Sequence, residues 1–321
     1  MNHQPSPFAP ARTQLDAVPK ALRARGYRFI AVTPATHRIV NARPENGMAC
    51  GIADVFGWNR NFTPEILGPE LFAIAQSAGV VVPAGNARSG VWRSLVRAAS
   101  LGELILLHSS FPTDSPESVF FGPDTYRFAD TVAAYLARRP VIGRAIDIGC
   151  GTGAVGLAIA RAYPGAQVVL ADLSPAALAA ASANAAAAGL ANVCCCHSDL
   201  LDGVEGRFDL IVANPPYLID PAARLYRHGG GRLGEGVSLR IVRTAPPLLA
   251  PGGSLVLYTG CAIVDGRDAF REAALPLVEA AGCRWTYREI DPDVFGEELA
   301  GGAYAGADRI AAVALTVERP S

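Results

Sequence analysis

The stretch Asp147-Ile148-Gly149-Cys150-Gly151-Thr152-Gly153 ends an apolar run and opens a segment with a helical pattern. Glycines at such a junction allow a tight turn and let a ligand approach the backbone at the start of a helix. Gly-x-Gly-x-Gly alone is weak evidence, because every tight turn favours glycine. Asp172 ends the next predicted strand, 25 residues after Asp147, where a carboxylate can accept both hydroxyls of a ribose. We therefore expect a nucleotide-like ligand at this turn.

From about residue 145 onward, predicted strands and helices alternate. The predicted strands are Ala145–Gly149, Gln167–Asp172, Asn192–Asp199, Phe208–Asn214, Ser254–Thr259, Arg284–Ile290 and Arg309–Val317. The predicted helices between them are Ala154–Tyr163, Pro175–Ala188, Val237–Leu249 and Arg267–Ala281. Continuous apolar strands separated by amphipathic helices predict an α/β fold with a seven-stranded, mostly parallel sheet covered on both faces. The last two strands lack a helix between them, so we expect an antiparallel pair at the sheet edge.

The N-terminal region has a different pattern. Helices are predicted at Leu15–Arg25, Pro64–Ala78 and Val91–Ala99, and strands at Glu103–His108 and Ser118–Phe121. Helices followed by a hairpin are also the order of a winged-helix module, which would suit substrate recognition. We therefore divide the chain into a disordered tail (1–19), a recognition domain (20–118) and a ligand-binding domain (119–321).

Composition restricts the class of protein. The chain has 321 residues, a formal net charge of −1 and 50% hydrophobic residues, enough for a sizeable core. It has no uninterrupted apolar stretch of about 18 residues, so we expect no membrane span. Its tail lacks the apolar segment of a signal peptide. The seven cysteines are interpreted as small buried hydrophobes in a reducing, cytoplasmic setting, without a metal site. Adjacent residues of a strand point to opposite faces, so Cys194-Cys195-Cys196 cannot converge on one ion.

A second motif, Asn214-Pro215-Pro216-Tyr217, closes the fourth predicted strand. The Asn214 side-chain oxygen and the Pro215 carbonyl offer two acceptors, and a planar NH2 group offers two donors. Binding both hydrogens biases the nitrogen lone pair out of the plane, toward an electrophile. The Tyr217 ring can cover the flat face of the same group. Pro215 and Pro216 fix the backbone, so the acceptors stay in place. The alternative is that the tetrad merely ends a strand.

The order of these motifs resembles a class I S-adenosylmethionine-dependent methyltransferase with a Rossmann-like sheet, over about residues 120–317. An NAD-dependent dehydrogenase fits less well, because its glycine spacing is wider and hydride transfer does not need the tetrad. The resemblance implies S-adenosylmethionine as cofactor, with Gly149, Gly151 and Gly153 beneath its methionine part and Asp147 nearby. It implies that Asp172 and Leu173 lie at the ribose, and Asp199 and Leu200 at the adenine. Phe121, Pro123 and Thr125 belong to a segment, Phe121–Thr125, similar to the one that covers the cofactor.

Within that class, Asn-Pro-Pro-Tyr is similar to two groups, the HemK-like protein-glutamine N5-methyltransferases and the N6-adenine methyltransferases of DNA and RNA. The runs Gly234-Glu235-Gly236 and Leu249-Ala250-Pro251-Gly252-Gly253 are more HemK-like. The chain departs from HemK-like enzymes at Tyr258-Thr259-Gly260, where they usually carry a Glu near the end of the next strand. The N-terminal region does not match their helical bundle either.

The resemblance implies direct transfer of a methyl group to nitrogen, with Asn214, Pro215, Pro216 and Tyr217 as the catalytic tetrad and no metal. We expect a macromolecular acceptor, a protein glutamine ahead of a nucleic-acid adenine or guanine, with a small-molecule amide third. A rival of another class is a non-catalytic, cofactor-binding RNA adaptor. His228 in the Gly-rich loop after the tetrad is a general base or, more simply, a loop residue. That loop is also a candidate lid. The oligomeric state stays open.

Overall fold

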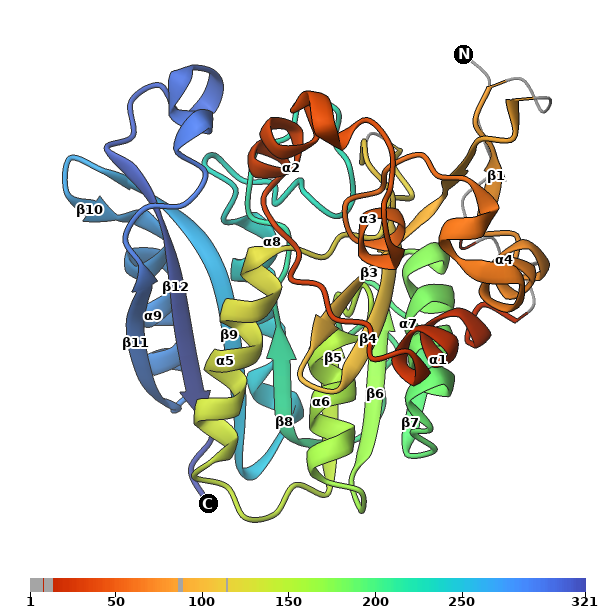
Figure 1. Cartoon of the computed structure of the whole chain (residues 1–321). Coiled ribbons are helices and arrows are strands. Elements are labelled where there is room, and N and C mark those ends of the chain that lie inside the picture. Colours follow the sequence, from red (N-terminus) through yellow and green to blue (C-terminus); the bar gives the residue numbers. More distant parts are fainter. Residues whose placement is uncertain (1–7, 9–13, 86–88, 114) are drawn as a thin grey trace. The chain divides into compact units, whose positions relative to one another are not determined.

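The computed structural model describes the chain outside residues 1–7, 9–13, 86–88 and 114 (Figure 1). Two compact units are present. The N-terminal unit comprises Met1–Tyr126, Gly151–Ala154 and Ser174–Ala191, and the sheet unit comprises Arg127–Cys150, Val155–Leu173 and Asn192–Ser321. Most of the predicted tail, residues 1–19, lies outside the described residues.

The sheet unit is built on one sheet with the strand order β11-β12-β9-β8-β5-β6-β7. Its strands are β5 (Arg144–Ile148), β6 (Gln167–Asp172), β7 (Val193–His197), β8 (Phe208–Ala213), β9 (Leu249–Val264), β11 (Arg284–Asp291) and β12 (Arg309–Glu318); the two-residue β10 (Arg267–Asp268) pairs with β9. The run from β9 to β7 is parallel, and β12 is antiparallel to both β9 and β11. This confirms the predicted α/β class, the mostly parallel sheet and the antiparallel pair at its edge.

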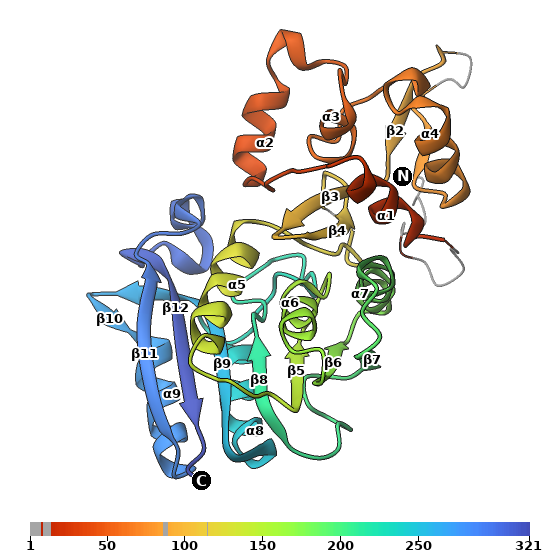
Figure 2. The same ribbon diagram turned by 60° about the horizontal axis from the view of Figure 1, so that its bottom comes forward.

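Helices cover both faces of this sheet. In Figures 1 and 2, α5 (Pro123–Leu136) and α6 (Ala154–Ala162) lie on one face, and α8 (Gly236–Thr244) and α9 (Ala269–Ala280) on the other. The face with α8 and α9 holds a continuous core, in which Ile241 and Phe270 join the strand residues Ile211 and Leu255. Apolar residues on both faces of the central strands explain why these strands read as unbroken apolar runs.

The N-terminal unit combines helices with two short antiparallel pairs of strands. Its helices are α1 (Ala17–Ala24), α2 (Pro34–Asn41), α3 (Ile52–Phe56), α4 (Gly68–Ser77) and α7 (Pro175–Ala188), with single 3-10 turns at Pro44–Asn46 and Pro64–Ile66. Strand β1 (Val81–Pro83) pairs with β2 (Trp92–Ser94), and β3 (Val96–Leu101) pairs with β4 (Leu104–Ser109). Side chains of α1, α4 and α7 share one apolar core with one face of β3 and β4.

Two predictions for this unit are wrong. The helix expected at Val91–Ala99 is instead the two strands β2 and β3, and no strand forms at Ser118–Phe121. The segment is rich in alanine, leucine and arginine, which favour helices, but it forms a strand because its alternate residues pack into the core. The sequence signal for the turn between β3 and β4 was Gly102, which has a φ of 55°. The hairpin that follows the helices is therefore β3–β4, and not the expected pair Glu103–His108 and Ser118–Phe121.

The cysteine interpretation also needs correction. Cys194 and Cys195 are exposed and Cys196 is partly exposed, whereas Cys150, Cys261 and Cys283 are buried. The three adjacent cysteines lie on β7, which is the last strand of the sheet order, so one edge of the strand is open. None of the described helices is long and apolar enough to cross a membrane.

Candidate functional site

The strand order reverses direction between β5 and β8. From β5 the chain moves outward to β6 and β7, and it then crosses back to β8 on the other side of β5. The connections that leave the carboxyl ends of β5 and β8 consequently run in opposite directions, and ligands of open α/β sheets bind at such a switch point. Gly149 follows β5 and Asn214 follows β8, so the structure brings the two sequence motifs to this switch point.

The glycine loop has a backbone that few other residues could adopt. Gly149, Gly151 and Gly153 have φ values of 64°, 54° and 77°, in the left-handed region that favours glycine. Between them, the Cys150 N–H donates to the Ala171 carbonyl at 3.1 Å, which ties the loop to the end of β6. The three glycines are therefore required by the turn itself.

Asp147 lies under this loop, near the end of β5. Its side chain is 2% exposed, and its Oδ2 accepts a hydrogen bond from the Gly156 N–H of α6 at 2.8 Å. Burial raises the pKa of Asp147 to about 7, and the negative charge of Asp172 adds to the effect. The carboxyl group thus changes charge near neutral pH, and a nearby cation would hold it ionised.

Asp172 ends β6 and is partly buried. A competing interpretation is that its carboxylate caps α7, but Ser174 does so instead, accepting from the Ala177 N–H at 3.3 Å. Asp172 is therefore not the capping residue. Leu173, beside it, is 42% exposed.

Asp199 follows β7, the next strand of the sheet. Its carboxylate forms an ion pair with Arg240 of α8 at 2.9 Å, and both side chains are about half exposed. Leu200 adopts a φ of 57°, which places a non-glycine residue in the left-handed region. A ligand group at Asp199 would share its carboxylate with Arg240.

Asn214 and Tyr217 follow β8, with Asn214 partly buried and Tyr217 8% exposed. The Tyr217 ring lies so close to Gly260 of β9 that a Cβ there would overlap it. Phe295 meets the same ring edge-on, with 5.9 Å between ring centres and an interplanar angle of 66°. Phe295 itself has a φ of 56°, an uncommon conformation for an aromatic residue. Gly260 and Phe295 thus fix the ring of the tetrad, a role that the sequence did not suggest.

Two loops hold the backbone after the tetrad. The Tyr304 hydroxyl accepts from the Ile219 N–H at 2.9 Å and donates to the Leu233 carbonyl at 3.1 Å. A Cβ on Gly234 would overlap the Tyr217 carbonyl, so only glycine allows this approach. The loop between β11 and β12 therefore braces the loop between β8 and α8.

Comparison with known proteins identifies the family of this chain. Residues 129–260, which include β5 to β8 and most of β9, match the family model described as "Methyltransferase small domain". A release factor glutamine methyltransferase of Bordetella pertussis is 32% identical over 241 residues, covering 69% of this chain and 85% of that protein. The chain belongs to the family of the release factor glutamine methyltransferases.

Other members of the family match over a shorter length. The release factor glutamine methyltransferase of Deinococcus radiodurans is 38% identical over 174 residues, 50% of this chain and 58% of that protein. A ribosomal protein uL3 glutamine methyltransferase of Neisseria meningitidis is 32% identical over 158 residues, 46% of this chain and 50% of that protein. The chain thus spans little more than half the length of these two relatives.

The structure explains how this member of the family departs from the HemK-like pattern. Gly260 stands in the segment where a Glu is usual, and its missing side chain is what makes room for the Tyr217 ring. Thr259, its neighbour, is fully buried and its hydroxyl shares a hydrogen bond of 2.8 Å with Ser238. An acidic side chain at position 260 would need a different position for the Tyr217 ring.

His228 and the arginines of the loop after the tetrad have structural partners. The His228 Nδ1 accepts from the Asp220 N–H at 3.1 Å. Arg224 binds Asp220 through two hydrogen bonds of 2.8 Å, and Arg227 pairs with Glu298. These contacts favour the interpretation of His228 as a loop residue. They also engage two arginines of this loop in ion pairs.

The N-terminal unit holds the predicted covering segment. Phe121 is 1% exposed and meets the Tyr126 ring edge-on, with 5.2 Å between ring centres. Pro123 begins α5, and Thr125 Oγ1 accepts a hydrogen bond from the Gly122 N–H at 3.3 Å.

Asn184 of α7 is a further buried polar residue, which the sequence did not indicate. It accepts from the Leu107 N–H at 2.9 Å, and donates to the Leu107 carbonyl at 3.2 Å and to the Thr152 carbonyl at 3.0 Å. Its buried amide thus anchors the glycine loop to β4.

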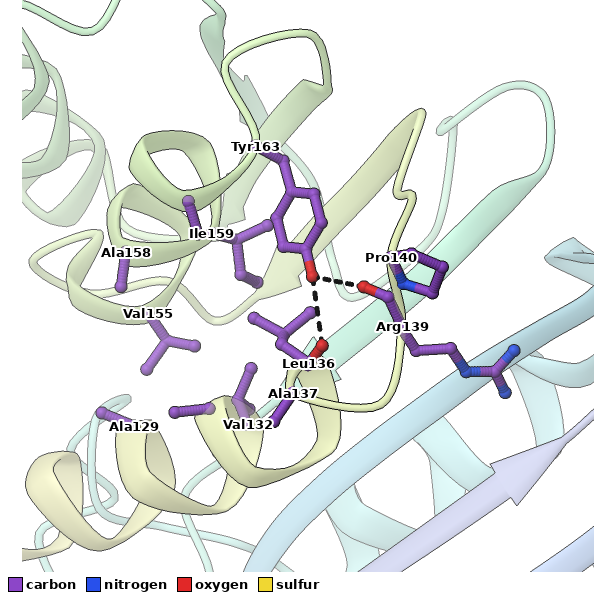
Figure 3. A pocket seen from close by; sticks show the side chains of 12 residues that line it. Ala129, Val132, Leu136, Ala137, Arg139, Pro140, Val155, Ala158, Ile159 and Tyr163 are labelled. Carbon is purple, nitrogen blue, oxygen red and sulfur yellow. Dashed lines mark hydrogen bonds between the residues drawn. The ribbon is translucent and has the colours of Figure 1, made fainter.

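An apolar pocket lies elsewhere in the sheet unit, between α5 and α6 (Figure 3). Val132, Leu136 and Val155 line it, and the Tyr163 hydroxyl at its border bonds to the Leu136 and Arg139 carbonyls at 3.2 and 2.6 Å. Its lining contains no carboxylate or amide side chain, so it lacks the chemistry of the switch point. Among the described residues, no group of three or more His, Cys, Asp or Glu is arranged to hold a metal ion.

Proposed function

We propose that this protein transfers a methyl group from S-adenosylmethionine to the side-chain amide nitrogen of a glutamine in a protein. The observation that carries the proposal is the Asn-Pro-Pro-Tyr tetrad at the switch point, in a chain whose relatives are named protein glutamine methyltransferases. Named acceptors of these relatives are a release factor and a ribosomal protein, and both support a protein acceptor here.

The residues near the glycine loop suit a nucleoside cofactor with a positively charged sulfur. Gly149, Gly151 and Gly153 present backbone without side chains, and Asp172 with Leu173 would hold the ribose. When bound, S-adenosylmethionine supplies an electrophilic methyl group on its sulfonium. Asp147, whose pKa is raised to about 7, would stay ionised beside that positive charge.

The adenine end would lie near Asp199 and Leu200. There the Asp199 carboxylate would accept a hydrogen bond from the exocyclic amine, in competition with Arg240. Phe121, Pro123 and Thr125 would belong to the segment that covers the cofactor. These roles follow from the resemblance stated above and remain predictions.

The tetrad would bind and orient the acceptor amide. Asn214 Oδ1 and the Pro215 carbonyl would accept its two hydrogens, while Pro216 keeps the backbone fixed. Tyr217, held by Gly260 and Phe295, would lie against the flat face of the amide. Catalysis would come from alignment of nitrogen, methyl carbon and sulfur, and from acceptors placed where the N–H dipoles grow.

Transfer of labelled methyl groups into cell extract tests the proposal. Label that protease digestion removes, and that nuclease digestion leaves in place, would support a protein acceptor. Loss of label to nuclease alone would contradict it in favour of adenine or guanine. Tight cofactor binding without any transfer would contradict it in favour of the non-catalytic adaptor.

A further inference from the structure

The β3–β4 hairpin of the N-terminal unit has one apolar face and one face with buried polar groups. Val96 and Leu107 belong to the apolar core of the unit. Arg97 and His108 are direct cross-strand partners, so their side chains leave the hairpin on the same face, opposite to that core. Both are almost completely buried, at 1% and 0% exposure.

Arg97 has no negatively charged partner among its described contacts. Its Nε donates to the Ser109 carbonyl at 3.1 Å, and its guanidinium carbon lies 3.6 Å from the centre of the Phe111 ring. Nη1 is buried and has no hydrogen-bond partner within the described part of the chain. Burial lowers the pKa of Arg97 to about 9, so the side chain still carries its charge at neutral pH.

His108 adds a second unpaired group at the same place. Neither of its ring nitrogens has a hydrogen-bond partner among the described residues. Burial, reinforced by the charge of Arg97, holds the pKa of His108 well below its usual range, so the ring is neutral. A neutral imidazole carries one N–H donor, and the Ser109 backbone, which lies near it and partly offsets the lowered pKa, does not meet hydrogen-bond geometry.

Buried polar groups in native proteins almost always have partners, and an exception needs an explanation. A buried, uncompensated guanidinium is especially unfavourable, because the charge has lost its water without gaining a counter-charge. Arg97 also contributes, after burial, to the lowered pKa of His37, which is about 4. Within the described part of the chain, no carboxylate is paired with the Arg97 guanidinium.

We propose that Arg97 and His108 form a binding site for one oxyanion, a carboxylate or a phosphate group, beneath the Phe111 ring. The guanidinium and the imidazole N–H would both donate to the anion, which supplies the missing charge. Phe111 is only partly buried, so displacement of this ring would expose the guanidinium to solvent. The site does not depend on the proposed methyl transfer.

Thermal unfolding of the full chain, with inorganic phosphate, acetate or chloride at matched ionic strength, tests the site. We expect phosphate or acetate to raise Tm by about 2–4 °C over chloride, because an anion that binds only the native state stabilises it. A response to phosphate alone assigns the site to phosphate groups, and a response to acetate alone assigns it to carboxylates. An equal Tm in all three salts would overturn the proposal.

Two arginine variants locate the effect. Arg97→Met should lose the anion response and be no less stable than the wild type in chloride, because it removes an uncompensated buried charge. Arg60→Met is the matched control, since Arg60 stacks near Trp58 in the same unit but is paired with Asp54 at 2.8 Å. It should lower Tm and keep the anion response. An anion response that persists in Arg97→Met would overturn the proposal.

Should Arg97→Met give no folded protein, His108→Phe decides the question, because it keeps the guanidinium and removes only the second donor. A clearly weaker anion response in His108→Phe supports the paired site. A response equal to that of the wild type contradicts it.

Discussion

The switch point of the sheet and the β3–β4 hairpin both bury polar side chains, but they satisfy them differently. At the switch point Asp147 accepts a hydrogen bond from Gly156, and the Tyr217 ring is fixed by Gly260 and Phe295. On the hairpin, Arg97 Nη1 and both nitrogens of His108 have no partner among the described residues. The first region satisfies its polar side chains within the protein, whereas the second leaves three buried polar atoms without a partner in the described part of the chain.

Asn184 shows that the hairpin can satisfy a buried amide completely. Its three hydrogen bonds reach Leu107 on the apolar face and Thr152 in the glycine loop. The unpaired groups on the opposite face are thus not a general property of this unit. A buried polar residue whose hydrogen bonds are all satisfied within the protein stabilises the fold, as Asn184 does. A buried polar residue without a partner needs another explanation, and a bound ligand is one.

The largest effect is expected at the tetrad. Asn214→Ala removes one of the two acceptors for the amide hydrogens, and we expect kcat to fall by roughly 10²–10³-fold. Cofactor affinity should change little, because the glycine loop and Asp172 are intact. Single-turnover methyl transfer and calorimetric cofactor binding measure the two effects separately. Equal turnover in wild type and variant would remove the tetrad from the mechanism.

Asp147, at the switch point, should make the free energy of unfolding of the protein depend on pH. Its raised pKa means that the native state keeps a proton that the unfolded chain loses, between about pH 4 and 7. Over that interval the free energy of unfolding should fall by roughly 3 kcal/mol as pH rises, with a slope that reaches at most about 1.4 kcal/mol per pH unit near the middle of the interval. Asp147→Asn cannot ionise, so this fall should disappear in urea unfolding curves. The exposed Asp202→Asn is the control, and a variant at position 147 with the wild-type slope would contradict the assignment.

Asn184→Leu tests the fully bonded side of the comparison. The substitution leaves the Leu107 N–H and two carbonyls without partners, so we expect a loss of about 2–3 kcal/mol in the free energy of unfolding. Denaturant unfolding measures it. Ser182→Ala, at an exposed position of the same helix, should change stability by less than about 0.5 kcal/mol. Comparable effects of the two substitutions would show that the amide network contributes little.

Gly260→Ala should have the smallest effect of these four substitutions. It changes only the position of the Tyr217 ring and removes no hydrogen bond or charge. Its Cβ would push the Tyr217 ring aside, and a displacement of this size at a reacting group lowers kcat by roughly 10-fold or more. Gly165→Ala is the matched control, because a Cβ there meets no atom and its φ is not positive. Unchanged kcat in Gly260→Ala would show that the ring position is irrelevant to transfer.

The sheet unit could be predicted from the sequence because the signals for its strands, helices and turns are local. Strand β6 matches its predicted bounds and helix α6 matches them to within one residue, and Gly149 and Asn214 stand directly after the strands that position them. The residues that were missed act across long distances in sequence. Gly260 of β9 and Phe295 of the loop between β11 and β12 touch the Tyr217 ring, and no local pattern predicts such a contact.

The strands of the N-terminal unit were predicted wrongly for a related reason. Residues 95–101 have the composition of a helix, and their strand conformation depends on packing in the unit's core and on the turn at Gly102. The pairing of Arg97 with His108 became visible only with the register of β3 and β4. Gly102 was the one signal in the sequence that could have revealed it.

The central claim is that the switch point methylates a protein glutamine, and the chemical identity of the product tests it most directly. Extract incubated with the wild-type protein and labelled S-adenosylmethionine should yield, after proteolysis, peptides with one methyl group on the side-chain amide nitrogen of a glutamine, located by mass spectrometry. Asn214→Ala should yield almost none. Label found on adenine or guanine, or on no macromolecule at all, would contradict the account.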